Sequence, residues 1–405
     1  MNFLPSFPLQ LNVIALFGIT LLLGLIGGEL AKRIRFLPRI SGYIAIGFLL
    51  GPGGFNIVSQ SVLVTARLFV DISLGIILFD LGRQLDFTWL RHDRGLFPMA
   101  IAESGITFIS IFTMVYLFVG LPWLPSMLAA SFAMATSPAV VMMVAHDLSS
   151  EGPVTRRTLV LTSLNNFFAL IVFTFLLPMT QSAPMKTSTL WMQSTYLIIG
   201  SLALAIAIFV LIRMMAILIG KQKQNQFVLF IGALVFTMGI AQILNLPTAL
   251  TLFILGVATR NIDRKHMLME IDFGWSARLF FILLFVVTGI HLRLEGLRIA
   301  AMAVIMFILI RGVAKTLGIW LFSSASRLTK KQILSVSLAL TPMAGLAISM
   351  SNVLDDFNPD LNRQIATIIA SVVAILEILG PIATQFAFIW AREATPNQAQ
   401  QGGQK

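Results

Sequence analysis

The sequence contains no cysteine and little charge, and both absences exclude broad classes of protein. Without cysteine there can be neither disulfides nor thiolate metal sites. Charged residues make up only 11% of the 405 residues, whereas a soluble domain of this size needs a charged surface. The four histidines show no ligand spacing, and we find no nucleophile with a partner base and no phosphate-binding loop. We therefore predict that the protein is not an enzyme and needs no cofactor.

The sequence is rich in long apolar runs. Hydrophobic residues make up 57% of the chain, and its mean hydropathy is +0.91. A membrane-spanning helix needs about 20 apolar residues, and about 13 runs of this type recur along the chain. The first run is too long for a signal-peptide core and lacks a cleavage pattern, so we interpret it as a true span. The pattern predicts an all-α polytopic membrane protein with spans near residues 10–31, 40–58, 62–81, 96–120, 124–146, 157–181, 190–219, 226–244, 246–260, 275–292, 297–321, 331–353 and 363–390.

Lysine and arginine gather in alternate connections between these spans. The connections KRIRFLPR, RQLDFTWLRHDR and KQKQNQ carry far more positive charge than GPGGFNIVSQS, GLPW and NLP. By the positive-inside rule the basic connections face the cytoplasm, which places the N-terminus outside the cell (inner) membrane and the C-terminus inside. This topology in a lipid bilayer accounts for the net charge of +11, so no nucleic-acid partner is expected. Residues 392–405 are predicted to form a short polar cytoplasmic tail.

Two of the predicted spans carry helix-breaking residues at their centres. Proline removes a backbone donor and frees a carbonyl, so a helix is kinked or interrupted there. One such site alone would indicate a simple kink. Here two such sites occur at corresponding places, each in the middle span of a three-span set. This pattern is typical of inverted-repeat transporters, whose broken helices cross at the bilayer midplane and face a substrate. The residues of the two breaks are Thr136, Ser137 and Pro138 in the fifth span, and Thr341, Pro342 and Gly345 in the twelfth.

Ionisable side chains within the spans are candidates for function, because a charge inside a bilayer is costly. Arg311 and Lys315 lie one turn apart on the same face of the eleventh span. Glu103 lies in the fourth span, and Glu377 lies near the middle of the thirteenth. Because two cations and two carboxylates balance, these residues either pair with one another and hold helices together, or contact the substrate and carry protons.

Two adjacent amides, Asn165 and Asn166, lie in the apolar run LTSLNNFFALIVF of the sixth span. A buried amide needs hydrogen-bond partners. One interhelical hydrogen bond in a membrane contributes only about 0.6–2 kcal/mol, so helix association alone is a weak reason for two amides. We expect both to face the crossing of the broken helices. There they would bind a cation or cap the carbonyls freed by Pro138 and Pro342, or else join helices in a degenerate site.

Several segments of the sequence together resemble a known family. They are ISGYIAIGFLLGP, ILFDLGRQLDF, ATSPAVV, FFILLFVVTGIHL, the Arg-x-x-x-Lys pattern of Arg311 and Lys315, and LALTPMAGLAIS. Their order and spacing are similar to those of the bacterial monovalent cation:proton antiporters, which include sodium/proton exchangers and the membrane domains of glutathione-gated potassium efflux systems. The resemblance covers about residues 10–390. It implies a sodium/proton antiporter-like fold with two inverted repeats, a homodimer, and an elevator motion of a core domain.

The resemblance also implies a division of the chain. Residues 96–188 and 297–391 (spans 4–6 and 11–13) would form the core transport domain as its first and second repeats. Residues 1–95 and 226–296 (spans 1–3 and 8–10) would form the dimerisation domain. Residues 189–225, which contain span 7, would connect the two domains.

The two amides depart from the family pattern. In the family, this place on the sixth span carries an Asp-Asp or Asn-Asp pair, and its aspartate binds both cation and proton. Neither Asn165 nor Asn166 can ionise, although their carbonyls can ligate a small cation. Lys315, which pairs with that aspartate in some members, needs another partner, for which Glu103, Glu377 and the amides are candidates. The predicted ion-binding residues are Asn165, Asn166, Thr136, Ser137 and Thr341, with the proton on Glu103 or Glu377.

Three functions follow from these observations. The first is a secondary active transporter that exchanges Na⁺ or K⁺ for protons and holds no metal beyond the transported cation. The second is an anion or organic-acid carrier that uses the positive charges of Arg311 and Lys315. The third is a non-transporting sensor or partner subunit on the same scaffold. The directions of Glu103 and Glu377 discriminate between them, because carboxyl groups that face the crossing favour the first function.

Overall fold

The computed structural model is helical throughout the residues that it describes, which are 13–34, 37–58, 60–181, 187–220, 222–263, 274–291, 295–343 and 345–394. Within these ranges, eight helical stretches are long and apolar enough to cross a membrane, judged by length and composition. The prediction of an all-α polytopic membrane fold is confirmed.

Each predicted span corresponds to one helix or to a pair of helices. The second span differs most, because its helix ends at Leu50 and the glycine- and proline-rich residues 51–54 form turns. Three short elements were not expected: α4 (Phe87–His92), a π-helical turn (Val115–Val119) and a 3₁₀ turn (Leu177–Thr180). The helices of the spans are α1 (Val13–Arg33), α2 (Arg39–Leu50), α3 (Gln60–Gln84), α5 (Leu96–Met114), α6 (Trp123–Met134) with α7 (Pro138–Asp147), α8 (Pro153–Leu176), α9 (Thr187–Ile219), α10 (Lys223–Ile243), α11 (Thr248–Ile262), α12 (Gly274–His291), α13 (Glu295–Leu321), α14 (Lys330–Ala339) with α15 (Gly345–Phe357), and α16 (Pro359–Ala391).

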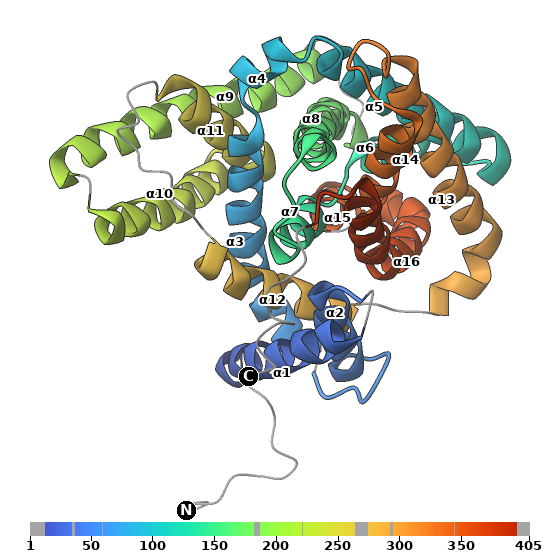
Figure 1. Cartoon of the computed structure of the whole chain (residues 1–405), viewed down its shortest axis with the longest axis horizontal. Helices are drawn as coiled ribbons and strands as arrows, with labels where there is room; N and C mark the ends of the chain where they lie inside the picture. Colours follow the sequence, from blue (N-terminus) through green and yellow to red (C-terminus); the bar gives the residue numbers. More distant parts are fainter. Residues whose placement is uncertain are drawn as a thin grey trace, which may run out of the picture.

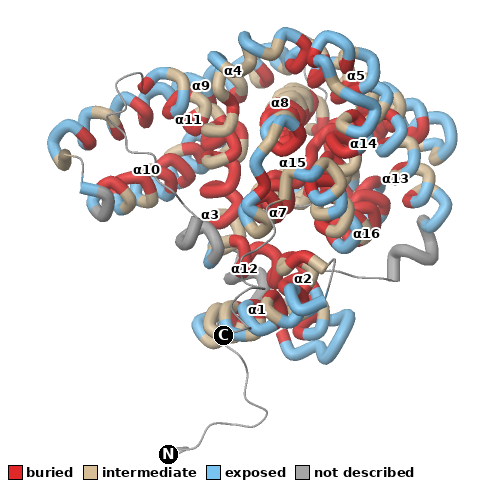
Figure 2. The backbone as a smooth tube through the Cα atoms, viewed as in Figure 1, coloured by how far each residue is buried: buried red, intermediate tan, exposed pale blue. Residues whose placement is uncertain are grey.

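Two sets of helices form one bundle, although α9 to α12 separate them in the sequence. We refer to α5 to α8 as the first repeat and to α13 to α16 as the second, after the division that the resemblance implies. α13 lies along α5, and α16 packs on α7, α13, α14 and α15 (Figure 1). The remaining helices form two further groups, α1 with α2 and α12, and α3 with α9, α10 and α11. Burial is densest at the centre of the bundle, whereas α9 and α10 have exposed outer faces (Figure 2).

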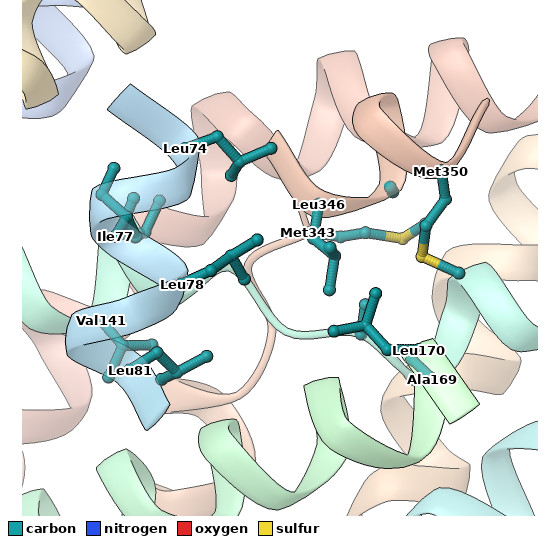
Figure 3. Packing of buried hydrophobic residues seen from close by; sticks show 14 of the residues in the cluster. Leu74, Ile77, Leu78, Leu81, Val141, Ala169, Leu170, Met343, Leu346 and Met350 are labelled. Atoms are coloured by element: carbon teal, nitrogen blue, oxygen red, sulfur yellow. The ribbon is translucent and has the colours of Figure 1, made fainter. Parts of the chain in front are cut away.

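The contact between α3 and the bundle is largely apolar. Leu74, Leu78 and Leu81 of α3 pack with side chains of α7, α8 and α15 (Figure 3). One polar contact crosses here, because Ser163 Oγ of α8 donates to the Leu81 carbonyl at 3.0 Å. Such an interface is held mainly by van der Waals packing of apolar side chains and not by a network of hydrogen bonds.

Close packing between α5 and α13 depends on a glycine. A Cβ on Gly318 of α13 would overlap the backbone of α5 at Glu103. Small residues allow membrane helices to approach in this way. Gly318 lies one turn from Lys315, so the same close approach brings the Lys315 side chain within reach of Glu103.

Glu393, which lies just after α16, contacts the start of α8. The two carboxylate oxygens of Glu393 accept hydrogen bonds from the backbone N–H groups of Val154 and Thr155, each at 2.7 Å. Thr155 Oγ1 donates a third at 2.8 Å, and a Cβ at Gly152 would overlap the Glu393 side chain. The first turn of a helix has unsatisfied N–H groups and a positive dipole end, so a carboxylate is favoured there. Glu393 therefore joins the end of the second repeat to the start of a first-repeat helix.

Asp86 fixes the connection between α3 and α5. It is the N-cap of α4, where it accepts from the Thr88 N–H at 2.8 Å and pairs with Arg260 of α11 at 3.0 Å. Burial raises the pKa of Asp86, but hydrogen bonds from the Thr88 hydroxyl, from Arg260 and from the backbone N–H groups of Thr88 and Trp89 lower it to about 2. The carboxylate is therefore charged at neutral pH and holds α4 against α11.

Candidate functional site

The two broken spans meet at their interruptions. α6 ends at Met134 and α7 begins at Pro138, while α14 ends at Ala339 and α15 begins at Gly345. Between them, the Ser137 N–H donates to the Pro342 carbonyl at 2.9 Å. The Ser137 side chain caps α7 by accepting from the Val140 N–H at 3.4 Å. Both segments are thus non-helical and adjacent, as the paired prolines predict.

Arg311 satisfies carbonyls of both breaks. Its guanidinium is buried, and its Nε and Nη2 donate to the carbonyls of Ala133 and Ala135 at 2.9 and 2.8 Å. Its Nη1 donates to the Thr341 carbonyl at 2.7 Å. The last carbonyls of a helix have no partner within the helix and form its negative dipole end, so a cation is favoured there. Arg311 therefore joins the end of α6 to the second break.

Lys315 pairs with Glu103, one of the partners that the sequence offers. The ion pair joins α13 to α5, and the two side chains are 1% and 0% exposed. Lys315 Nζ also contacts the Met134 carbonyl at 3.2 Å and Thr136 Oγ1 at 3.3 Å. Removing either partner of a buried ion pair leaves an uncompensated charge, which costs about 3–5 kcal/mol. The pair is therefore a strongly coupled unit at the edge of the first break.

The two amides face the first break and have different roles there. Asn166 Nδ2 donates to the carbonyls of Thr136 and Thr162 at 2.7 and 2.8 Å. Asn165 Oδ1 accepts from Ser104 Oγ at 3.0 Å, and its Nδ2 lies 3.5 Å from Thr136 Oγ1. Within the described residues, Asn166 Oδ1 is buried and has no hydrogen-bond partner. Asn166 is thus a cap with a spare acceptor.

One expected contact differs from the structure. Pro138 cannot donate to the carbonyl of Met134, and we expected an amide to bind that freed carbonyl. Lys315 binds it instead, while Asn166 binds the Thr136 carbonyl two residues later. The difference follows from side-chain length, because the long Lys315 side chain extends from α13 to the Met134 carbonyl, whereas the amide side chains on α8 are shorter.

Glu377 lies on the face of α16 that contacts the second break. Gly380, one turn later, packs on Pro342, and Thr384 Oγ1 donates to the Ala339 carbonyl at 3.3 Å. Residues at positions i, i+3 and i+7 share one face of a helix, which places Glu377 on the same face. Its side chain is fully buried, and neither carboxyl oxygen has a hydrogen-bond partner in the described ranges.

Sequence reasoning missed two polar residues of this region. Ser104 contacts both Glu103, at 3.2 Å, and Asn165, and so links the ion pair to the amides. Thr384 caps the end of α14. The available signals were weak: Ser104 is the neighbour of a buried charge, and Thr384 follows Glu377 by seven residues on one face.

Several buried oxygen atoms lie at or beside the first break, and those of Glu103 belong to a carboxylate. Glu103, the Asn165 and Asn166 carbonyls, and Thr136 Oγ1 are the hard ligands that alkali cations prefer. Ser137 and Thr341 contribute backbone contacts to the crossing, through the Ser137 N–H and the Thr341 carbonyl. Donor groups of Arg311 and Lys315 are directed at protein carbonyls and at Glu103. The site is therefore better suited to a cation than to an anion.

Comparisons with known proteins identify chains of similar fold. The chain is similar to the sodium proton antiporter MjNhaP1 from Methanocaldococcus jannaschii in two solved structures. The structure at pH 8 is 17% identical over 96% of this chain and 97% of that chain, with a TM-score of 0.68. The structure from an electron-microscopy map is 16% identical over 94% and 96%, with a TM-score of 0.74.

At these identities the likeness shows the fold alone. The search of curated proteins finds no match. A family model described as "Sodium/hydrogen exchanger, transmembrane" matches residues 18–390. Because that model covers most of the sequence, the chain belongs to the sodium/hydrogen exchanger family of multi-pass membrane proteins.

Proposed function

We propose that the protein exchanges a monovalent cation, Na⁺ or K⁺, for protons across the membrane. The observation that carries the proposal is the buried Glu103–Lys315 ion pair, which lies beside the crossing of two broken helices. Family membership and the fold of MjNhaP1 support it. The pair supplies a carboxylate where the sixth span has only amides.

Exchange follows if cation and ammonium compete for Glu103. When a cation binds the Glu103 carboxylate, the Lys315 ammonium loses its counter-ion in a buried site and releases its proton. The buried site is neutral before the step, with Glu103 negative and Lys315 positive, and neutral after it, with the bound cation in place of the proton. Each bound cation thus releases one proton from this pair, and because both compete at one pair of groups, their binding is negatively coupled.

The cation needs further oxygen ligands once it replaces the ammonium. We assign this role to the side-chain oxygens of Asn165, Asn166 and Thr136, with Ser137 and Thr341 at the crossing itself. Asn166 Oδ1 is a suitable first ligand, since it has no other partner among the described residues. Arg311 would keep the carbonyl ends in place throughout the cycle.

We further propose an elevator motion in which α5–α8 and α13–α16 move as the core transport domain, residues 96–188 and 297–391. Residues 1–95 and 226–296 would form the dimerisation domain of a homodimer, with residues 189–225 as the connector. The apolar contact of α3 with α7, α8 and α15 supports this, because apolar surfaces slide without breaking many directional bonds (Figure 3). The basic connections and residues 392–405 would face the cytoplasm of the inner membrane.

The test is exchange in proteoliposomes with a pH-sensitive dye inside. Gradients of Na⁺, K⁺ and Li⁺ are imposed in turn, and we expect at least one to drive proton movement. Glu103→Gln should abolish that movement. Glu29→Gln is the matched control, because Glu29 pairs with Arg39 on α2 away from the crossing and is half exposed. Wild-type protein that moves no protons with any of the three cations would overturn the proposal.

A further inference from the structure

We propose that Glu377 is a second proton-binding site of this exchanger, separate from the Glu103–Lys315 pair. The proposal rests on the proposed cation:proton exchange and adds its proton count. It starts from a side chain that the ion pair does not use: a carboxyl group with no exposed surface and no hydrogen-bond partner within the described residues.

Burial determines the charge of this carboxyl group. An ionised carboxylate without a partner in the protein interior costs several kcal/mol or more, and such a group binds a proton instead. Glu103 escapes this cost because Lys315 neutralises it. Among the described residues Glu377 has no such partner, so in this state it holds a proton as a neutral carboxylic acid.

The charged groups on the helices around α16 are engaged elsewhere. Arg311 and Lys315 of α13 bind carbonyls of α6 and Glu103. Lys331 of α14 lies over the Trp390 ring, near the far end of α16. Tyr43 of α2 is buried in the middle of its helix, and neither carboxyl oxygen of Glu377 is hydrogen-bonded to it. The other charged and titratable residues of the packed helices whose side chains are described lie at helix ends and form no ion pair with Glu377: Lys330 of α14, Asp355 of α15, His146 and Asp147 of α7, Arg39 of α2, and Arg156 and Arg157 of α8.

The position of Glu377 links it to the moving part of the site. The face of α16 that carries it contacts Pro342 through Gly380 and the Ala339 carbonyl through Thr384. It therefore lies about one helical turn from the second break, while Glu103 lies beside the first. An apolar side chain could fill this space without the free-energy cost of burying a carboxyl group. The presence of an acid here therefore indicates a role in binding a proton.

The proton balance follows from the two sites. When the crossing opens to one aqueous side, the Glu377 O–H bond breaks, the proton enters the water, and the electron pair stays on the carboxylate beside an incoming cation. Lys315 releases the other proton when that cation takes Glu103. Two protons then leave for each cation that binds, and one net charge crosses the membrane in each cycle. Without Glu377 the exchange would be one for one and electrically silent.

The experiment compares wild-type, Glu377→Gln, Glu377→Asp and the control Glu29→Gln in the same proteoliposomes. Currents are recorded on a solid-supported membrane after a jump in Na⁺, and in parallel K⁺ or Li⁺, while an internal dye reports proton movement. We expect current and dye response from wild-type, Glu377→Asp and Glu29→Gln. Glu377→Gln should keep the dye response and lose the current. A Glu377→Gln protein with undiminished current per proton moved overturns the proposal.

A second measurement does not depend on transport. Infrared spectra of the purified protein across a pH titration report the C=O stretch of protonated carboxyl groups. We expect a carboxylic-acid band at neutral pH in wild-type that Glu377→Gln removes and Glu29→Gln keeps. If that band is the same in wild-type and Glu377→Gln, Glu377 holds no proton and the inference fails. If the band behaves as expected but no cation is exchanged, the proposed function fails while the protonated state of Glu377 stands.

Discussion

The two repeats of the bundle carry opposite charge on their first helices. α5 of the first repeat contributes Glu103, and α13 of the second contributes Arg311 and Lys315. The third helices also differ, since α8 presents the amides Asn165 and Asn166 and α16 presents the acid Glu377. Repeats of related architecture thus hold a complementary set of groups.

The two breaks also differ in the groups that bind their carbonyls. At the end of α6, the carbonyls of Ala133, Met134 and Ala135 all receive side chains from α13. At the end of α14, the Ala339 carbonyl is bound by Thr384 of its own repeat. Three carbonyls at the end of α6 thus bind buried cations, whereas at the second break Arg311 binds the Thr341 carbonyl and neutral groups bind those of Ala339 and Pro342. Substitutions at the two breaks should differ accordingly.

The largest effect is expected for Arg311→Ala. This change leaves the carbonyls of Ala133, Ala135 and Thr341 without the donors they now have, and each buried unsatisfied group costs about 1–3 kcal/mol. We expect little folded protein by size-exclusion chromatography and a markedly lower Tm. Arg311→Lys should recover only part of the loss, because an ammonium lacks the planar set of donors. An Arg311→Ala protein with wild-type Tm would mean that the first break does not need a cation.

The next effect concerns the ion pair as a unit. Glu103→Gln or Lys315→Met alone leaves one buried charge unpaired, and each should lower the free energy of unfolding by about 3–5 kcal/mol. The double variant removes both charges and should recover much of that loss. The thermal stabilities of all four proteins form a double-mutant cycle. Additive losses would show that the two side chains are not coupled, contrary to the contact described here.

A smaller effect separates the two amides. Asn166→Asp replaces a donor that serves two carbonyls with a charged acceptor, so we expect a loss of about 1–3 kcal/mol in stability. Asn165→Asp keeps the acceptor for Ser104 and places a carboxylate near the Lys315 site. It should fold normally and shift the pH optimum of exchange, measured with the internal dye. Equal stability of the two variants would contradict the distinct roles assigned to them.

The smallest effect is expected at the second break. Thr384→Val preserves shape and removes a neutral hydroxyl that donates to the Ala339 carbonyl at 3.3 Å and to the Gly380 carbonyl of its own helix at 3.0 Å. The change should cost about 0.5–1.5 kcal/mol. Thr316→Val is the control, because the Thr316 hydroxyl is exposed and bonds only to a carbonyl of its own helix. If Thr384→Val destabilises the protein more than Asn166→Asp does, the second break depends on its capping side chain at least as much as the first break does.

Much of the fold is predictable from local properties of the sequence. Apolar runs, basic connections and the prolines at 138 and 342 act through short-range physics, so they locate the spans and both breaks. The early end of α2 shows the limit of hydropathy, because residues 51–58 are apolar enough to extend the run while their glycines and proline form turns.

The contacts between side chains of the site are not predictable from local properties of the sequence. Glu103 and Lys315 are 212 residues apart, and nothing local to either one indicates the other. The sequence also suggests that the amides bind the carbonyls freed by proline, whereas the longer side chains of α13 reach the end of α6 first. Such competition between side chains depends on helix spacing, here on the close approach at Gly318, and becomes visible only in three dimensions.

The bond between Glu393 and the start of α8 has a consequence for biosynthesis. The two ends of this contact are 239 residues apart, so α8 leaves the ribosome long before its partner is made. Until then, the first-turn N–H groups of Val154 and Thr155 lack the carboxylate that later binds them. The first turn of the helix that carries the two amides therefore gains its carboxylate only after α16 has been made.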